Sequence, residues 1–180
     1  MNNNFSKKTV QVLLNNFNMN NHELVISKTK NYLKKFPRIA ILYNLLGSSY
    51  QKIGKQEEAI NVFNDGLKID PNNVSFSNNL ANSYKYLLNY KKAESIFKNI
   101  LKKYPKYTNA YINLGNLKRD INNFDEAIRL YEKANETSPN HFVILYSLAL
   151  AYQGIGDFEN AINYSKKVLS LNPKFTKADY

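Results

Sequence analysis

Few residues of this 180-residue chain belong to the types that carry out chemistry. The only histidines, His22 and His141, stand alone, and neither belongs to an HxxxH or similar metal-binding spacing. Acidic residues recur in phase at the expected starts of helices, where negative charge interacts favourably with the helix dipole: Glu57, Glu58, Asp125, Glu126 and Glu159. We interpret them as helix-start and solubility residues, and we expect no catalytic residue, no metal site and no cofactor.

Phosphate-binding and nucleophile motifs are missing from the sequence as well. It contains no GxxxxGK[ST], no GxGxxG and no GxSxG, and it has no cysteine for a thiolate or a disulfide. The first residues do not resemble a secretory signal, and the longest apolar run, 142–152, is about half of what a bilayer span requires. We therefore expect a cytoplasmic protein without a membrane span.

The net charge of +11 raises the question of nucleic acid or acidic membranes as partners. Of the 25 basic residues 22 are lysine, so arginine, whose planar fork suits phosphate better, is scarce. We interpret the lysines as a solvated surface and do not expect nucleic-acid binding. Weak binding of RNA or an anionic surface through a lysine-rich face stays open as an alternative.

The five prolines reveal how the chain is organised. They stand 34 residues apart, at Pro37, Pro71, Pro105, Pro139 and Pro173. A fixed period of this length indicates an array of small units, each stacked on the next, without a single globular centre.

Each unit has the pattern of two helices. In the second unit Gly54 separates predicted helices over 40–53 and 56–69, and in the first unit the predicted helices are 6–17, capped by Ser6, and one from Asn20 or Asn21 to Phe36. The units are predicted at about 6–39, 40–73, 74–107, 108–141 and 142–175. We expect a disordered tail at 1–5 and the start of a truncated further helix at 176–180.

The second unit resembles the tetratricopeptide repeat, through seven residues at that family's offsets: Tyr43, Leu46, Gly47, Tyr50, Ala59, Phe63 and Pro71. The fourth unit is a second near-complete match in which Lys118 replaces the second tyrosine. The resemblance implies an all-α fold, an α-solenoid in which antiparallel helix pairs form a right-handed superhelix. It also implies that the first helices line a concave groove and that the second helices form the convex side.

Helical spacing projects a set of residues into that groove. We predict a partner-binding site formed by Asn44, Ser48, Asn78, Asn79, Asn82, Lys85, Ile112, Asn113, Asn116, Arg119, Tyr146 and Gln153. Asn79 and Asn82 recur 34 residues later as Asn113 and Asn116, and carboxamides can read the backbone of an extended peptide whatever its side chains. These groove asparagines are similar to those in the repeats of O-linked N-acetylglucosamine transferases.

A carboxylate clamp of the kind found in chaperone-binding members is not matched, because Asn44 and Ser48 stand where Lys and Asn are needed. Lys85 and Arg119 would nevertheless suit an acidic partner. We interpret the chain as a protein–protein interaction scaffold that binds a partner protein or an extended peptide and is not an enzyme. The alternative from the enzyme class is the substrate-presenting region of a larger glycosyltransferase or sulfotransferase. The last helix, 157–171, is expected to leave Ala161, Tyr164 and Val168 uncovered, which would allow self-association there.

Overall fold

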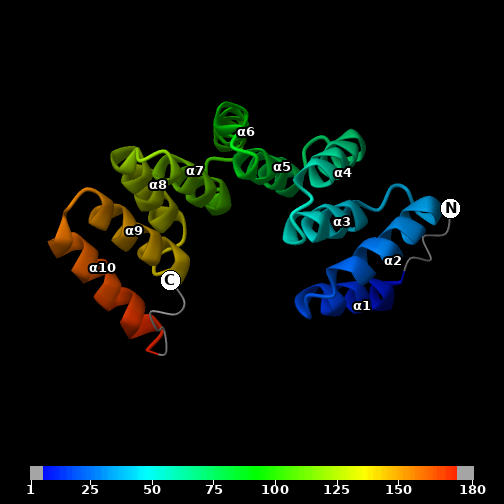
Figure 1. The fold of residues 1–180 in the computed structure, drawn as a ribbon, viewed down its shortest axis with the longest axis horizontal. Coiled ribbons are helices and arrows are strands. Elements are labelled where there is room, and N and C mark those ends of the chain that lie inside the picture. The colour runs from blue at the N-terminus through cyan, green and yellow to red at the C-terminus, as the bar shows by residue number, and fades with distance from the viewer. Residues whose placement is uncertain (1–5, 174–180) are drawn as a thin grey trace. The chain divides into compact units, whose positions relative to one another are not determined.

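The computed structural model describes residues 6–173. Within this range the chain forms ten α-helices and no strand, and Figure 1 shows them following one another as hairpin pairs. Their bounds are α1 Lys7–Asn18, α2 His22–Lys35, α3 Ala40–Lys52, α4 Gln56–Ile69, α5 Val74–Tyr86, α6 Tyr90–Lys103, α7 Thr108–Asp120, α8 Phe124–Thr137, α9 Phe142–Gly154 and α10 Phe158–Leu171. The all-α class is confirmed, and the predicted helix bounds in the first two units agree within a residue or two. The predicted tail at 1–5 and the predicted helix at 176–180 lie outside the described residues.

The turn inside each helix pair repeats with the 34-residue period. At this turn one residue adopts a positive φ: Asn20, Gly54, Leu88, Asn122 or Gly156. Glycine and asparagine tolerate this left-handed conformation, whereas Leu88, at φ 59°, pays about 1–2 kcal/mol of steric strain for it. Several helices then begin at a side chain that accepts a backbone N–H, as Ser6 does from Thr9 and Asp157 does from Asn160.

The helices divide into two compact units, with the boundary inside α6 between Ile96 and Phe97. In the first unit α3 packs against α2 and α4, and α4 packs against α5. Its core gathers the large side chains of these helices, including Leu46, Phe63, Phe76 and Leu80. A second cluster joins α1 and α2 to α3 through Leu13, Val25 and Leu42.

Close approach of the two helices of a pair depends on glycine. A Cβ atom on Gly47 would lie 2.4 Å from the ring of Phe63, and one on Gly115 would lie 2.5 Å from the ring of Tyr131. Both rings are completely buried, so neither can move away. Glycine at these positions therefore sets the distance between α3 and α4 and between α7 and α8.

In the second unit α7 pairs with α8 and α9 pairs with α10, while α9 also covers α8 (Figure 1). The prediction for the face of α10 that stays open was wrong. Val168 is 1% exposed and Ala161 is 9% exposed, because these residues face α9 and hold the pair together.

Three exposed apolar side chains of α10, Phe158, Ile162 and Leu169, lie on the neighbouring stripe of the helix. Ile162 is 55% exposed, whereas Ile128, one repeat earlier on α8, is 8% exposed beneath α9. The self-association expected from the sequence would have to use this stripe. Among residues 6–173 no helix combines the length and the apolar character needed to cross a bilayer.

Candidate protein-binding faces

The predicted groove residues lie on the first helix of each pair. In the first unit α3 and α5 touch each other directly and carry Asn44, Ser48, Asn78, Asn79, Asn82 and Lys85. In the second unit α7 and α9 touch each other and carry Ile112, Asn113, Asn116, Arg119, Tyr146 and Gln153. We call these two sets the α3/α5 face and the α7/α9 face, and we describe each within its own unit.

A hydrogen-bond network ties the α3/α5 face together. The Nδ2 of Asn79 donates to the Oδ1 of Asn44 at 3.0 Å. Beside it, the Nε2 of Gln51 donates to the backbone carbonyl of Asn79 at 2.9 Å and to the hydroxyl of Ser83 at 2.8 Å. Two carboxamides, one from each first helix, are thereby held in fixed positions at the surface.

The other residues of the α3/α5 face differ in their exposure. Asn78 is buried at 5% exposure, so it contributes to the inside of the helix pair more than to a binding surface. Ser48, Asn82 and Lys85 are half-buried, and the carboxamide of Asn82 makes no hydrogen bond within the described part of the chain. Asn82 therefore keeps its full donor and acceptor capacity for a partner.

On the α7/α9 face a buried tyrosine of α8 holds one asparagine in place. The hydroxyl of Tyr131, on α8, donates to the Oδ1 of Asn116 at 2.8 Å. That bond occupies one lone pair of the carboxamide oxygen, so the NH₂ group of Asn116 and the second lone pair are left for other contacts. Phenylalanine occupies the position of Tyr131 in the second unit, at Phe63, so this support exists only where the repeat carries tyrosine.

The remaining part of the α7/α9 face is more apolar. The rings of Phe142 and Tyr146 stack with centroids 6.4 Å apart at 10° between their planes, and Val143 is 42% exposed beside them in the sequence. Arg119 is half-buried and Gln153 is exposed. Ile112, predicted as an apolar contact, is only 8% exposed because it belongs to the core cluster of this unit.

The buried phenol gives the second unit a testable pH dependence. Burial raises the pKa of Tyr131 to about 12, although the charge of Arg119 works in the opposite direction. Since the pKa of this group is higher in the folded chain than the value of about 10 in an unfolded one, folding favours the neutral phenol. The stability it contributes is fully present below pH 10 and is lost as the pH rises towards 12.

The rise of the Tyr131 pKa from about 10 to about 12 on folding corresponds to about 3 kcal/mol of stability that is lost across this pH range. Denaturant unfolding between pH 9 and pH 12 is therefore expected to show a steeper loss for the native chain than for Tyr131→Phe. At neutral pH the same variant loses about 1 kcal/mol, because the Oδ1 of Asn116 loses its donor. Parallel alkaline curves for the two proteins would contradict this assignment.

Lys118, which replaces the expected tyrosine, is a buried cation. Its side chain is 7% exposed, and its Nζ lies 3.0 Å from the Oε2 of Glu126 on α8. Glu126 also accepts a hydrogen bond from Asn123, the residue that caps α8. The pair lies between α7 and α8 and helps to hold the helices that carry the α7/α9 face.

Two lysines of the second helices lie against aromatic rings. The ammonium group of Lys92 lies 4.2 Å from the ring centroid of Tyr84, and that of Lys167 lies 4.9 Å from the centroid of Tyr164. Such contacts contribute about 0.5–1 kcal/mol at exposed sites. They give these two lysines a structural role.

The two histidines lie at the starts of α2 and α9. His22 is buried, with its ring edge-to-face against Phe17, and His141 is exposed at the residue before α9. Over residues 6–173 no group of three or more histidine, aspartate or glutamate side chains is arranged so that it could hold a metal ion.

Comparison with known solved structures gives the same architecture. The crystal structure of MamA is 25% identical over 92% of this chain and 96% of that chain, with a TM-score of 0.70. PilW, described as a widely conserved type IV pilus biogenesis factor, is 20% identical over 99% and 82% of the two chains, with a TM-score of 0.84. A thermophilic TPR protein of Thermus thermophilus is 17% identical over 94% and 91%, with a TM-score of 0.82. The last two likenesses show the fold alone.

No curated protein sequence matches the chain. Family models do match it. A TPR repeat model matches residues 47–86, and two tetratricopeptide repeat models match residues 89–141 and 143–175. Together with the 34-residue period and the ten helices observed over residues 6–173, these matches lead to one conclusion: the chain belongs to the tetratricopeptide repeat family.

Proposed function

We propose that the chain is an interaction scaffold that binds a partner protein, as an extended peptide segment, on its first-helix faces, and that it performs no chemistry of its own. The observation that carries this proposal is the network of Asn44, Gln51 and Asn79 on the α3/α5 face. It orders carboxamides at the surface of neighbouring helices, where a peptide backbone could be read by both donors and acceptors.

The bonds inside this network lower the cost of binding. Fixing a long polar side chain at an interface costs about 0.5–1.5 kcal/mol of conformational entropy. Asn79 and Asn44 are already ordered in the free chain, because the Nδ2 of Asn79 donates to the Oδ1 of Asn44 at 3.0 Å. Binding therefore loses little further conformational entropy at these two side chains. One N–H and the oxygen of the Asn79 carboxamide are not used by the bond to Asn44.

The charge of the chain favours an acidic partner. With a net charge of +11, the chain attracts a negatively charged segment over distances comparable with the Debye length. Lys85 on α5 and Arg119 on α7 are half-buried cations on the first-helix faces, one in each unit. We infer that acidic side chains in the bound segment would add to the backbone contacts made by the asparagines.

A pair of double variants on neighbouring helices tests the proposal. The partner is first isolated by co-purification from the source cells and identified by mass spectrometry. Asn79→Ala with Asn82→Ala, on the α3/α5 face, is then expected to weaken its affinity on the order of tenfold or more, through the loss of two hydrogen-bonding side chains.

The matched control is Asn61→Ala with Asn64→Ala, which makes the same change at the same spacing on α4, where both side chains are exposed. Isothermal titration calorimetry compares the two, and circular dichroism shows that both variants keep their helices. Equal affinity for both double variants would refute a role for the α3/α5 face.

A further inference from the structure

One small constellation of residues occurs twice in the chain, 68 residues apart. The first copy contains Pro37, Tyr43, Asp65 and Lys68, and the second contains Pro105, Tyr111, Lys133 and Glu136. In both copies the proline precedes a first helix, the tyrosine lies in that helix, and the two charged residues lie in the last turns of the second helix. The charges of the two helix residues are exchanged between the copies.

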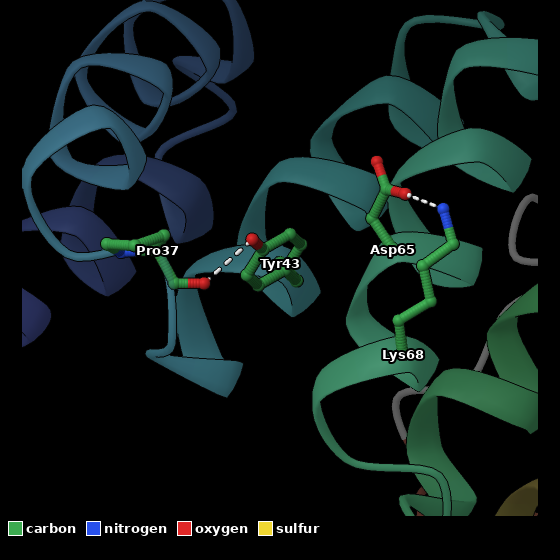
Figure 2. Close-up of polar contacts among 4 residues, drawn as sticks. All are labelled: Pro37, Tyr43, Asp65 and Lys68. Atoms are coloured by element: carbon green, nitrogen blue, oxygen red, sulfur yellow. Dashed lines mark hydrogen bonds and ion pairs between the residues drawn. The ribbon is translucent and has the colours of Figure 1, made fainter.

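In the first copy every polar group is satisfied by another group of the same copy. Figure 2 shows the hydroxyl of Tyr43 donating to the carbonyl of Pro37 at 2.8 Å and the Nζ of Lys68 bound to the Oδ1 of Asp65 at 2.8 Å. Burial, together with the negative charge of Asp65, raises the pKa of Tyr43, so the carboxylate acts on the phenol as well. We call this copy closed, because its polar side chains bind groups of the same copy.

The second copy is open, in the sense that its corresponding side chains do not bind one another and line a pocket instead. A pocket of about 510 Å³ lies between the start of α7 and the end of α8, and its lining consists of Pro105, Lys106, Tyr111, Lys133, Glu136 and Thr137. Within the described part of the chain the hydroxyl of Tyr111 makes no hydrogen bond, and Lys106, Lys133 and Glu136 make no ion pair.

The exchange of charges explains why the second copy does not close on itself. In the first copy Lys68 stands one residue before the end of α4, where the negative end of the helix dipole favours a cation. In the second copy Glu136 stands one residue before the end of α8, where the dipole disfavours an anion. A pair with the lysine ahead of the acid is also the weaker orientation on a helix. The side chains of Glu136 and Lys133 are thus available to bind a ligand.

We propose that this pocket binds a zwitterion of the amino-acid type that carries an apolar side chain. The ammonium groups of Lys106 and Lys133 and the hydroxyl of Tyr111 supply donors for its carboxylate, and Glu136 supplies the acceptor for its ammonium group. Pro105 and the ring of Tyr111 provide apolar surface for its side chain. The volume lies within the range of about 300–1,000 Å³ that is usual for small-molecule sites. Glu136 opposes ligands that carry only negative charge, such as inorganic phosphate.

The ligand chemistry is tested by titrating the ¹⁵N-labelled chain with L-phenylalanine and recording amide chemical shifts. Saturable shifts are expected at residues 106–111 and 133–137. N-acetyl-L-phenylalanine, which lacks the ammonium group, and L-phenylalaninamide, which lacks the carboxylate, are each expected to bind at least fivefold more weakly. The absence of shifts at these residues, or equal binding of all three compounds, would overturn the proposal.

Two double variants then test the site itself. Lys133→Asp with Glu136→Lys reproduces the closed arrangement of the first copy and is expected to abolish binding of L-phenylalanine. Asp65→Asn with Lys68→Gln removes the corresponding charges in the first copy and is expected to leave binding unchanged. All four positions are exposed, so both variants keep the helical circular dichroism of the native chain. Retained binding in the first variant, or an equal loss in both, would show that the pocket is not the site.

Discussion

Replacing Glu126 by glutamine is expected to lower the free energy of unfolding by about 3 kcal/mol, because it removes the carboxylate that lies 3.0 Å from the buried ammonium group of Lys118. The shape of the side chain is almost unchanged, so the loss reports the charge rather than packing. Only 7% of the Lys118 side chain is exposed, which leaves water little access to compensate.

The control is Asp125→Asn, which removes the same charge from the same first turn of α8 at an exposed position. It is expected to cost less than about 0.5 kcal/mol. Denaturant unfolding followed by circular dichroism measures both. Similar small losses in the two variants would show that Lys118 does not depend on Glu126.

A repair of the same site gives the complementary result. Tyrosine stands at the position of Lys118 in three other units, as Tyr50, Tyr84 and Tyr152. Lys118→Tyr combined with Glu126→Gln is therefore expected to recover most of the stability that Glu126→Gln loses alone, since a buried ion pair can be exchanged for apolar packing at little cost.

Gly47→Ala is expected to lower the free energy of unfolding by about 2–3 kcal/mol, the second large effect that the structure predicts. The new Cβ would lie 2.4 Å from the ring of Phe63, which is fully buried and cannot turn aside. The helices α3 and α4 must then move apart, and the packing between them is lost.

Gly66→Ala provides a graded comparison, because its Cβ would lie 3.0 Å from the ring of Phe76 and needs a smaller adjustment. Its expected loss is smaller than that of Gly47→Ala. Phe63→Leu, which makes room at the contact, is expected to cost less in the Gly47→Ala background than in the native chain, as a double-mutant cycle can measure. Additive losses would contradict a direct clash between the two residues.

The sequence carried enough information for the fold. Backbone geometry acts over a few residues and therefore leaves a local pattern in the sequence. That pattern consists of the period of the prolines, the small residues Gly47 and Ala59, and the helix-breaking Gly54. The same pattern locates the first helices, and hence the faces on which the candidate binding residues lie.

The details of the site depend on contacts that no local pattern contains. The bond between Asn44 and Asn79 joins residues 35 positions apart, and the support of Asn116 comes from a tyrosine hydroxyl of the following helix. The sequence does show that the fourth unit carries a tyrosine, Tyr131, where the second unit has Phe63. It does not show which acceptor the hydroxyl of Tyr131 binds. The sequence prediction assigned the exposed stripe of α10 to the wrong residues. The side chains that face α9 and those that would face a next helix are neighbours on α10, and the sequence pattern alone does not separate them.

Site-specific photo-crosslinking tests directly whether a partner protein binds on the first-helix faces. A photoreactive residue is placed at Asn82 or Asn116, on the first helices, or at Asn64 or Asn163, on the second helices, and the chain is irradiated in its source cells. One partner, identified by mass spectrometry, is expected to be linked from Asn82 and Asn116 and not from Asn64 or Asn163. Linkage of that partner only from the second-helix positions would show that it does not bind on the first-helix faces.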